Sequence, residues 1–226
     1  MELQLKIRNI NFYYEKHSNK IEINIEGYNI SPQIDDIDNG HLLSIANYTP
    51  YEYKKNPVFS SIWYANENFN RLIMDNKNEE QAAEKISGII AVFLKVNEII
   101  KYFKPDYVIH APIYYERIPP RWYKEKTYVE IISKEFRITS IGNLIIKDHE
   151  FSMKGKSPSE RRKLAEEHFK VNKTDYDLNT KNILFIDDVI TTKSTSEVIS
   201  EKLHNKFNIN QFLGVFAGKT QNPRFE

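Results

Sequence analysis

The chain has 226 residues, of which 40% are hydrophobic and 13% aromatic, so it can fill the core of one sizeable domain, alone or with a small appendage. With 32 basic and 31 acidic residues, the formal net charge of +1 gives no overall attraction to nucleic acid or to membranes. The sequence contains no cysteine, which excludes disulfides and thiolate metal sites. It shows neither an apolar stretch of the ~20 residues that span a bilayer nor the apolar core of a signal peptide, so a cytoplasmic protein is expected.

Residues 1–76 predict a β-rich and aromatic N-terminal region. Apolar and polar residues alternate over residues 2–30, the period that is typical of half-buried strands, and the turn at His17–Lys20 favours antiparallel pairing around it. The acidic segment Pro32–Gly40 is interpreted as a linker or loop. Aromatic residues gather over 41–76, where they could stack on bases or fill an interface. We expect them instead to pack at a domain junction.

Residues 77–226 alternate helical and strand patterns, which predicts an α/β domain whose parallel sheet is flanked by helices. The pattern over 79–103 is helical, and a short apolar strand follows at Tyr107–His110. His110, at the end of this strand, is interpreted as a packed histidine rather than a ligand contact. The later predicted elements are a helix over 129–136, a strand over 141–147, a helix from near Ser159, a short strand at 169–171, a buried strand from Asn182 and a last strand at Gln211–Ala217.

A basic loop follows the first strand of this domain. It runs over 112–126 and carries Arg117 and Arg121. Arginine is well shaped for bidentate phosphate contacts, so such a loop at the carboxyl edge of a sheet suits a polyphosphate. The alternative is a solvated surface loop.

The most informative stretch is 182–197. Four apolar residues, Ile183–Ile186, predict a strand buried on both faces, and Asp187 and Asp188 follow where that strand should surface. A hydroxyl-rich turn comes next, and then a helix, for which Ser194 and Glu197 fit a capping box. Strand, acidic pair, polar turn and helix together indicate a site at the carboxyl edge of a parallel sheet.

The residue types in this stretch favour a phosphorylated ligand that bears hydroxyl groups. Backbone N–H groups at a helix N-terminus bind phosphate. Asp187 and Asp188 would repel phosphate, but they can accept hydrogen bonds from sugar hydroxyls or help to hold hydrated Mg²⁺. A sugar phosphate satisfies both halves. The alternative is an acidic pair without a ligand, followed by hydroxyls that cap a helix.

The stretch from Ile183 to Thr195 resembles the phosphoribosyl pyrophosphate (PRPP) motif of the type I phosphoribosyltransferases. That motif has four apolar residues, two acids, two apolar residues and Thr-Thr-Gly-x-Thr, and this chain departs from it only at Lys193, which replaces the glycine. Over roughly residues 80–220, the order of features is most similar to the ComF-like branch of the family. Many members of that branch begin with a four-cysteine zinc ribbon, which this chain cannot form.

The resemblance implies a type I phosphoribosyltransferase-like sheet flanked by helices, with a small β-rich N-terminal appendage. It implies that Asp187 and Asp188 hold the ribose hydroxyls together with Mg²⁺. It also implies that the loop with Ala111, Arg117 and Arg121 meets the pyrophosphate, Arg121 helping to stabilise its departure. The turn that would bind the 5′-phosphate is made of Thr191, Thr192, Lys193, Ser194 and Thr195.

Two functions remain open from the sequence. The first is transfer of ribosyl 5-phosphate from PRPP to an unidentified nucleophile, and the second is non-catalytic sensing of PRPP or a nucleoside monophosphate, with a homodimer possible in either case. Glycine in such turns often permits a positive φ, so Lys193 strains the turn, or offsets that cost by pairing with phosphate, or marks a chain in which PRPP binding has been lost. A role on DNA has no support from the balanced charge. Gly214–Thr220 resembles a P-loop, but its spacing is wrong and no helix can follow, so a P-loop NTPase is rejected.

Overall fold

In the computed structural model, the backbone is described for residues 2–7, 10–16, 23–25, 28–30, 32–51, 54–55, 64, 66–76, 79–112, 114, 124–153 and 155–220, and side chains from residue 32 onward except those of 124–126. The elements in the first part of the chain are β1 (Glu2–Ile7), β2 (Ile10–Lys16), β3 (Ile23–Ile25), β4 (Tyr28–Ile30), β5 (Gln33–Ile37), β6 (Gly40–Tyr48), α2 (Glu67–Asp75), α3 (Glu80–Val96) and α4 (Ile99–Phe103). Those that follow are β7 (Tyr107–His110), α5 (Lys124–Phe136), β8 (Thr139–Ser140), β9 (Ile145–Lys147), α6 (Pro158–His168), β10 (Phe169–Val171), β11 (Asn182–Ile190), α7 (Ser194–Phe207) and β12 (Gln211–Thr220).

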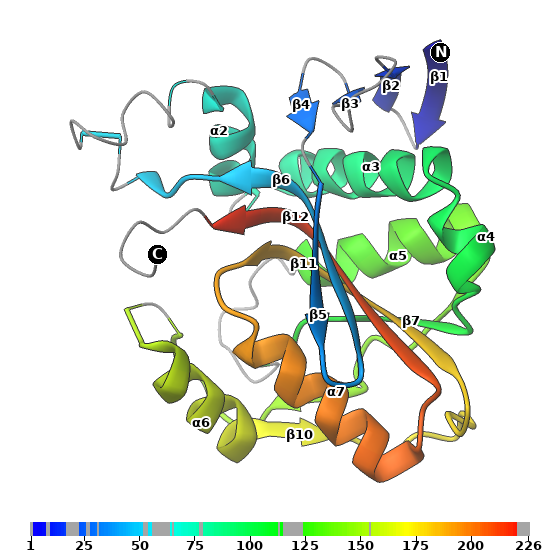
Figure 1. Cartoon of the computed structure of the whole chain (residues 1–226), viewed down its shortest axis with the longest axis vertical. Coiled ribbons are helices and arrows are strands. Elements are labelled where there is room, and N and C mark those ends of the chain that lie inside the picture. Colours follow the sequence, from blue (N-terminus) through cyan, green and yellow to red (C-terminus); the bar gives the residue numbers. More distant parts are fainter. Residues whose placement is uncertain are drawn as a thin grey trace.

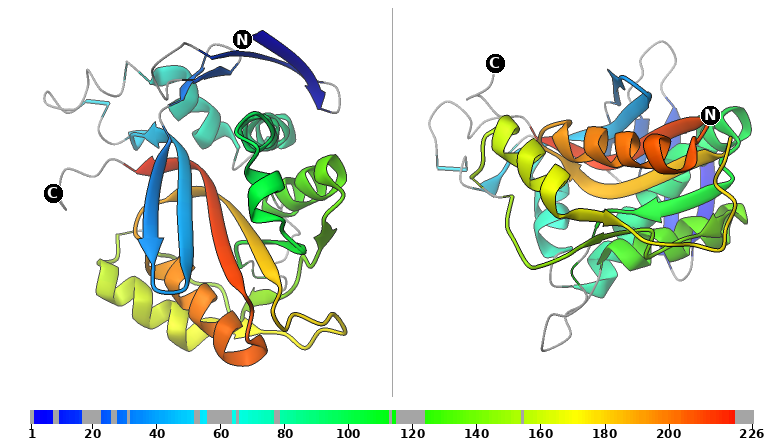
Figure 2. Two further views of the ribbon diagram at one scale, coloured as in Figure 1. Left: turned by 45° about the vertical axis from the view of Figure 1, so that its right-hand side comes forward. Right: turned by 90° about the horizontal axis from the view of Figure 1, so that it is seen from below.

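A mostly parallel sheet forms the centre of the molecule (Figure 1). Its strand order is β5-β6-β12-β11-β7-β8, and every neighbouring pair is parallel except the edge pair β5 and β6. Helices α3 and α5 cover one face, and α6 and α7 lie on the other (Figure 2). The predicted α/β class, with a parallel sheet flanked by helices, is confirmed.

Strand β11 separates two hydrophobic cores. Leu184 and Ile186 belong to the core that includes α2, α3 and α5. Ile183 and Phe185 belong to the core on the opposite face, together with α7. These four residues are 0% exposed, because side chains alternate along a strand and each face of this sheet is covered. The prediction that this strand is buried on both faces is confirmed.

Helix α3 is apolar on most of its surface because it has neighbours on several sides. It packs against α5, β12 and β2, and its buried positions run from Ala82 to Leu94. The helical prediction over 79–103 holds except at a break, where Glu98 has a left-handed φ of 54° and separates α3 from the short helix α4. Within the described residues, no helix is both long and apolar enough to cross a bilayer.

The N-terminal strands form a second, antiparallel sheet in the order β1-β2-β3-β4. Strand β2 pairs with β3, with Lys16 opposite Ile23, so the predicted pairing around residues 17–20 is confirmed, although those turn residues lie outside the described part. This agrees with the expected β-rich N-terminal appendage.

The interpretation of 32–40 as a linker or loop is wrong. Strand β5, a turn at Asp38 and Asn39, and the start of β6 form a hairpin at the edge of the central sheet. The acidic residues that suggested a loop suit an edge strand, because charge on an edge discourages pairing with another chain. Strand β6 pairs in parallel with β12. The predicted domain boundary after residue 76 therefore assigns two neighbouring strands of one sheet to different domains.

The bounds of several other elements differ from those predicted. The strand expected over 141–147 is shorter, because residues 142–144 form a turn between β8 and β9, and β9 pairs with β10 in a separate two-stranded sheet. The helix expected over 129–136 begins at Lys124. The last strand continues to Thr220, so the segment that resembled a P-loop is part of β12.

Gly40 permits close packing of β6 against β12, and its replacement by alanine is predicted to destabilise the protein. A Cβ at this position would lie 2.2 Å from the carbonyl oxygen of Phe212 in the adjoining strand. Because backbone must shift to relieve that contact, we expect Gly40→Ala to lower the free energy of unfolding by about 1–3 kcal/mol in urea titrations. Gly142→Ala is the control, because its nearest contact would be an ordinary 3.5 Å; equal losses in the two variants would contradict the prediction.

Candidate functional site

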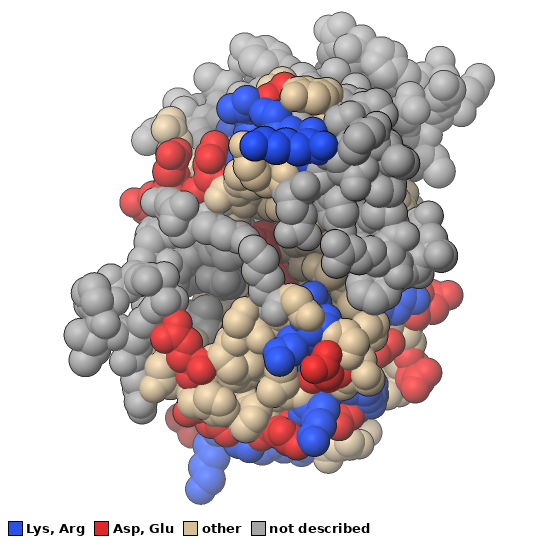
Figure 3. Space-filling model, turned by 90° about the vertical axis from the view of Figure 1, so that its left-hand side faces the viewer, with Lys and Arg blue, Asp and Glu red and all other residues tan. Residues whose placement is uncertain are grey.

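The topology contains a switch point between β7 and β11. The chain leaves β7 through α5 toward β8, and it leaves β11 through α7 toward β12, on the other side. Open α/β sheets bind ligands at the carboxyl ends of strands that diverge in this way. The ends of the two strands are joined by a hydrogen bond of 3.3 Å from the Ala111 N–H to the carbonyl oxygen of Ile186. Figure 3 shows a hollow in this face of the molecule, with acidic atoms at its floor.

The acidic pair lies within β11 rather than after it. Asp187 and Val189 remain in the ladder with β12, opposite Phe216 and Gly218. Asp187 Oδ1 accepts a hydrogen bond of 2.8 Å from the Asp188 N–H, and Asp188 Oδ1 accepts one of 2.8 Å from the Val189 N–H. Strand alternation turns the two side chains to opposite faces, so Asp188 is only 8% exposed whereas Asp187 is half-buried.

Asp188 is held by a buried hydrogen-bond chain. Asn76, at the end of α2, donates from Nδ2 to Asp188 Oδ2 over 3.3 Å. The hydroxyl of Tyr128, in α5, donates to Asn76 Oδ1 over 2.5 Å. Both Asn76 and Tyr128 are 0% exposed. The sequence did not predict a role for Asn76 or Tyr128. In the sequence, Asn76 is only a polar residue in an aromatic-rich segment, and Tyr128 is only a tyrosine on an apolar helix face.

The hydroxyl-rich turn leads directly into α7. Thr191 Oγ1 lies 3.2 Å from Thr220 Oγ1, and Thr192 Oγ1 donates to Ser194 Oγ over 3.4 Å. Thr195 is half-buried in the first turn of the helix. Among the described residues, no side chain caps the N-terminus of α7. The first backbone N–H groups of the helix lack an intrahelical partner, which is the chemistry that suits an anion.

The predicted capping box of Ser194 and Glu197 is wrong. Lys193 occupies the N-cap position, with dihedrals that are already helical, and Ser194 is the first residue of the helix. The hydroxyl of Ser194 donates to the carbonyl oxygen of Pro158 over 3.1 Å, and Glu197 contacts Arg162 instead of its own helix terminus. A capping box does occur at the start of α6, where Ser157 and Glu160 bond reciprocally.

Lys193 does not adopt the conformation that would require glycine. Its φ is −70° and its ψ −18°, within the right-handed helical region. Its ammonium lies 3.4 Å from Asp35 Oδ1 and 3.3 Å from the carbonyl oxygen of Asp36, both in β5. Lys219, in β12, lies 2.8 Å from the other oxygen of Asp35. Of the possibilities open from the sequence, backbone strain from a positive φ is excluded, and the ammonium pairs with a carboxylate of the protein.

The pair of lysines perturbs Asp35. Burial raises the pKa of this carboxyl, which is 18% exposed, but the hydrogen bonds and charges of Lys219 and Lys193 lower the pKa by more, so it lies below its ordinary value. Asp35 thus links the edge hairpin both to the hydroxyl-rich turn before α7 and to the end of β12.

The cations expected near the phosphate are only partly described. Ala111 is buried beside Ile186, whereas Arg117 and Arg121 lie outside the described residues. Arg162, in the basic segment before the motif, is occupied: its guanidinium lies 2.8 Å from Glu201 and 2.8 Å from Glu166. The hydrogen bond to Glu201 raises the pKa of Arg162, against a smaller effect of burial.

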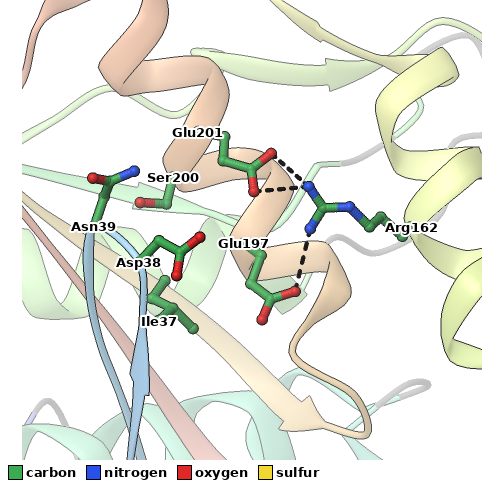
Figure 4. A pocket seen from close by; sticks show the side chains of 7 residues that line it. All are labelled: Ile37, Asp38, Asn39, Arg162, Glu197, Ser200 and Glu201. Atoms are coloured by element: carbon green, nitrogen blue, oxygen red, sulfur yellow. Dashed lines mark hydrogen bonds and ion pairs between the residues drawn. The ribbon is translucent and has the colours of Figure 1, made fainter.

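A cavity of about 320 Å³ lies beside α7, between the β5–β6 turn and α6 (Figure 4). Its lining includes three carboxylates, those of Asp38, Glu197 and Glu201. The one arginine of this lining, Arg162, is already paired with Glu197 and Glu201. Such a lining repels phosphate, so this cavity is not the predicted site.

His110 ends β7 as a packed side chain, in agreement with its interpretation from the sequence. It is 2% exposed, and its Nδ1 lies 2.6 Å from the carbonyl oxygen of Ala111. Burial lowers the pKa of His110, with a smaller opposing effect of that backbone contact, so the ring is neutral at pH 7. Its buried Nε2 has no partner in the described structure and faces Gly142.

The donor set at the end of β11 fits Mg²⁺. The half-buried Asp187 and the positioned Asp188 offer hard oxygen ligands, and Mg²⁺ usually takes one or two carboxylates while keeping several waters. With Mg²⁺ bound, the ion would supply positive charge to neutralise phosphate oxygens.

The sequence matches no protein-family model and no curated protein. Its structure is similar to solved structures that include adenine phosphoribosyltransferase from Saccharomyces cerevisiae, with 13% identity, coverage of 62% of this chain and 70% of that chain, and a TM-score of 0.39. Another is hypoxanthine phosphoribosyltransferase from Staphylococcus aureus, with 12% identity, coverage of 62% and 75%, and a TM-score of 0.39. A hypothetical protein from Neisseria gonorrhoeae with bound ppGpp has 14% identity, coverage of 65% and 75%, and a TM-score of 0.35. Scores this low assign neither a family nor an activity.

The hydrogen-bond chain to Asp188 is predicted to contribute to stability. Tyr128→Phe removes one hydroxyl and leaves Asn76 Oδ1 without that donor in a buried position. We expect a loss of about 1–3 kcal/mol in the free energy of unfolding, measured by urea titration. Tyr176→Phe, at a partly exposed tyrosine, is the control and should change stability by less than about 0.5 kcal/mol. A loss no larger in Tyr128→Phe than in the control would argue against the chain.

The lowered pKa of Asp35 predicts a specific pH dependence. Because the folded state favours its ionised form, the stability from Asp35 is present above its ordinary pKa near 4 and is lost as pH falls through the lower folded value. Thermal unfolding of wild type and Asp35→Asn should therefore differ at pH 6 and converge toward pH 2. A difference that stays constant over this range would contradict the ion-pair explanation.

Proposed function

We propose that the chain is a type I phosphoribosyltransferase that binds PRPP with Mg²⁺ where β7 and β11 diverge. The observation that carries the proposal is that the acidic pair and the uncapped N-terminus of α7 lie at one end of β11, separated only by residues 189–193. Within the family, the order of strand, arginine loop, helix, basic segment and acidic motif favours the ComF-like branch.

The phosphate-binding part of the proposal uses backbone groups. The turn and first helical residues before and in α7 are Thr191, Thr192, Lys193, Ser194 and Thr195, and their backbone N–H groups would hold the 5′-phosphate. The helix dipole adds favourable charge at the same point. The ammonium of Lys193 pairs with Asp35, so we assign it no direct phosphate contact.

The ribose-binding part uses the acidic pair. Asp187 and Asp188 would accept hydrogen bonds from the ribose hydroxyls, as the motif implies. The buried Asn76 fixes one oxygen of Asp188, so its orientation is set before the ligand arrives, which lowers the cost of positioning. Both carboxylates would also favour the positive charge that develops on the ribose ring in the transition state.

The proposed reaction breaks the bond between the anomeric carbon and a pyrophosphate oxygen. Pyrophosphate leaves with the electron pair, a nucleophile forms the new bond to carbon, and the proton of the nucleophile is released to solvent. Ala111, Arg117 and Arg121 belong to the segment after β7 that would meet the pyrophosphate, and Arg121 would stabilise its departure.

A second candidate is binding of PRPP or a nucleoside monophosphate without transfer. It is favoured by Lys193, which brings a long side chain, paired with Asp35, to the motif position that glycine holds in the family. The two candidates share the binding site and differ in whether pyrophosphate is released.

The acidic pair is predicted to be required for binding. Calorimetry with PRPP, ribose 5-phosphate and nucleoside monophosphates, each with and without Mg²⁺, tests the site. We expect Asp187→Asn and Asp188→Asn each to weaken PRPP binding by about tenfold or more, because a tenfold loss needs only about 1.4 kcal/mol. Asp175→Asn, at an exposed position, is the control. No binding of any ligand by wild type would overturn the site, and binding without pyrophosphate release across a broad acceptor panel would favour the second candidate.

The side chain of Lys193 is predicted to be dispensable for binding. Since the residue is already helical and its ammonium pairs with Asp35, we expect Lys193→Ala to change PRPP affinity by no more than about twofold. Lys202→Ala removes an equal charge further along α7 and serves as the control. A tenfold loss confined to Lys193→Ala would show that the ammonium binds the phosphate after all.

A further inference from the structure

We propose that Asp148, His149 and His168 form a binding site for a divalent transition metal, with Zn²⁺ as the best-suited ion. One donor atom from each residue lies within 4.8 Å of the others, in the described part of the chain. The cluster is remote in sequence from the acidic pair of β11 and is independent of the proposed function. It contains two imidazoles, which distinguishes it from an ordinary patch of surface carboxylates.

The backbone holds the three residues together. Asp148 and His149 directly follow β9, whereas His168 ends α6 and directly precedes β10. The two strands pair antiparallel, and the Asp148 N–H donates to the carbonyl oxygen of His168 over 3.1 Å. The positions of the ligands are therefore fixed by a sheet rather than by a mobile loop.

The side-chain geometry is close to what a tetrahedral ion needs. Asp148 Oδ1 lies 2.7 Å from His149 Nδ1 and 3.2 Å from His168 Nδ1. Metal–ligand bonds of about 2.0–2.1 Å at tetrahedral angles separate donors by roughly 3.3 Å. The imidazole rings meet edge to face, with centroids 4.2 Å apart, so both Nδ1 atoms lie near one carboxylate oxygen. Small rotations would centre an ion among them.

The neighbouring charges suit this role. Lys170 lies 3.5 Å from Asp148 Oδ2, the oxygen that does not contact either histidine, so it fixes the carboxylate and leaves Oδ1 for the ion. Glu167 lies 3.7 Å from His168 Nε2, the ring nitrogen that is not a proposed ligand atom, so a proton held on Nε2 would leave Nδ1 for the ion. Such partners orient metal ligands in known sites.

The donor set selects the class of metal. Imidazole nitrogen with one carboxylate suits Zn²⁺ and related transition metals, whereas Mg²⁺ prefers oxygen ligands alone. Three protein ligands leave one tetrahedral position for water. A bound ion would connect the end of β9 to the junction of α6 and β10, so the site would stabilise the small sheet beneath α7.

Titration of the full chain with ZnCl₂, after removal of any affinity tag and in competition with a chromogenic chelator, tests the site. We expect one Zn²⁺ per chain, an affinity at least tenfold lower in His149→Gln and in His168→Gln, and no displacement by millimolar Mg²⁺. His41→Gln is the matched control, because His41 lies 2.7 Å from Asp36 in a similar exposed pair without a third ligand.

A second measurement keeps the proposal testable if one variant folds poorly. Saturating Zn²⁺ should raise the thermal midpoint of wild type and of His41→Gln, and this rise should disappear in His168→Gln. Co²⁺ should give the visible absorption of a tetrahedral complex with wild type and with His41→Gln, but not with His168→Gln. Equal Zn²⁺ binding by wild type and both site variants, or less than one ion per chain in wild type, would overturn the proposal and leave an aromatic contact between two histidines.

Discussion

The structure depends on one strand that is buried on both faces and carries two carboxylates near its carboxyl end. Side-chain alternation along β11 sends its apolar residues into two separate cores and continues without interruption through Asp187 and Asp188. The alternation that packs the sheet therefore also decides which of the two carboxylates is more deeply buried. Asp188 turns toward α2 and α5, where only a polar partner such as Asn76 can make its burial tolerable.

Charge around the candidate site is largely balanced within the protein. Asp35 pairs with both Lys193 and Lys219, and glutamates of α6 and α7 pair with Arg162. The described cations are thus used to hold the edge hairpin and the two helices in place. Under the proposed function, phosphate binding then falls mainly on backbone N–H groups at the start of α7, whose strength does not depend on a titrating side chain.

The order of elements could be predicted from the sequence because it rests on local patterns. The apolar run of β11 and the four-residue spacing along α7 specify strand and helix without knowledge of neighbours. Contacts between distant segments could not be predicted in this way. The acidic segment at 33–37 is a strand only because β6 offers it an edge, and Ser194 is not a cap because Pro158 takes its hydroxyl. The hydrogen bonds from Tyr128 to Asn76 and from Asn76 to Asp188 form only after α5, α2 and β11 have packed together.

The parallel pairing of β6 with β12 has a consequence for how the protein is made. Gly40 lies opposite Phe212, so a strand near the start of the chain acquires its inner neighbour only when β12 has been synthesised. Until then, β6 has β5 on one side and an unpaired edge on the other, and the predicted ligand site has no complete sheet beneath it. Such long-range pairing slows folding and exposes apolar strand edges in the nascent chain. Strand β5, which is charged, covers the outer edge of β6 during synthesis, and the inner edge stays unpaired until β12 has been made.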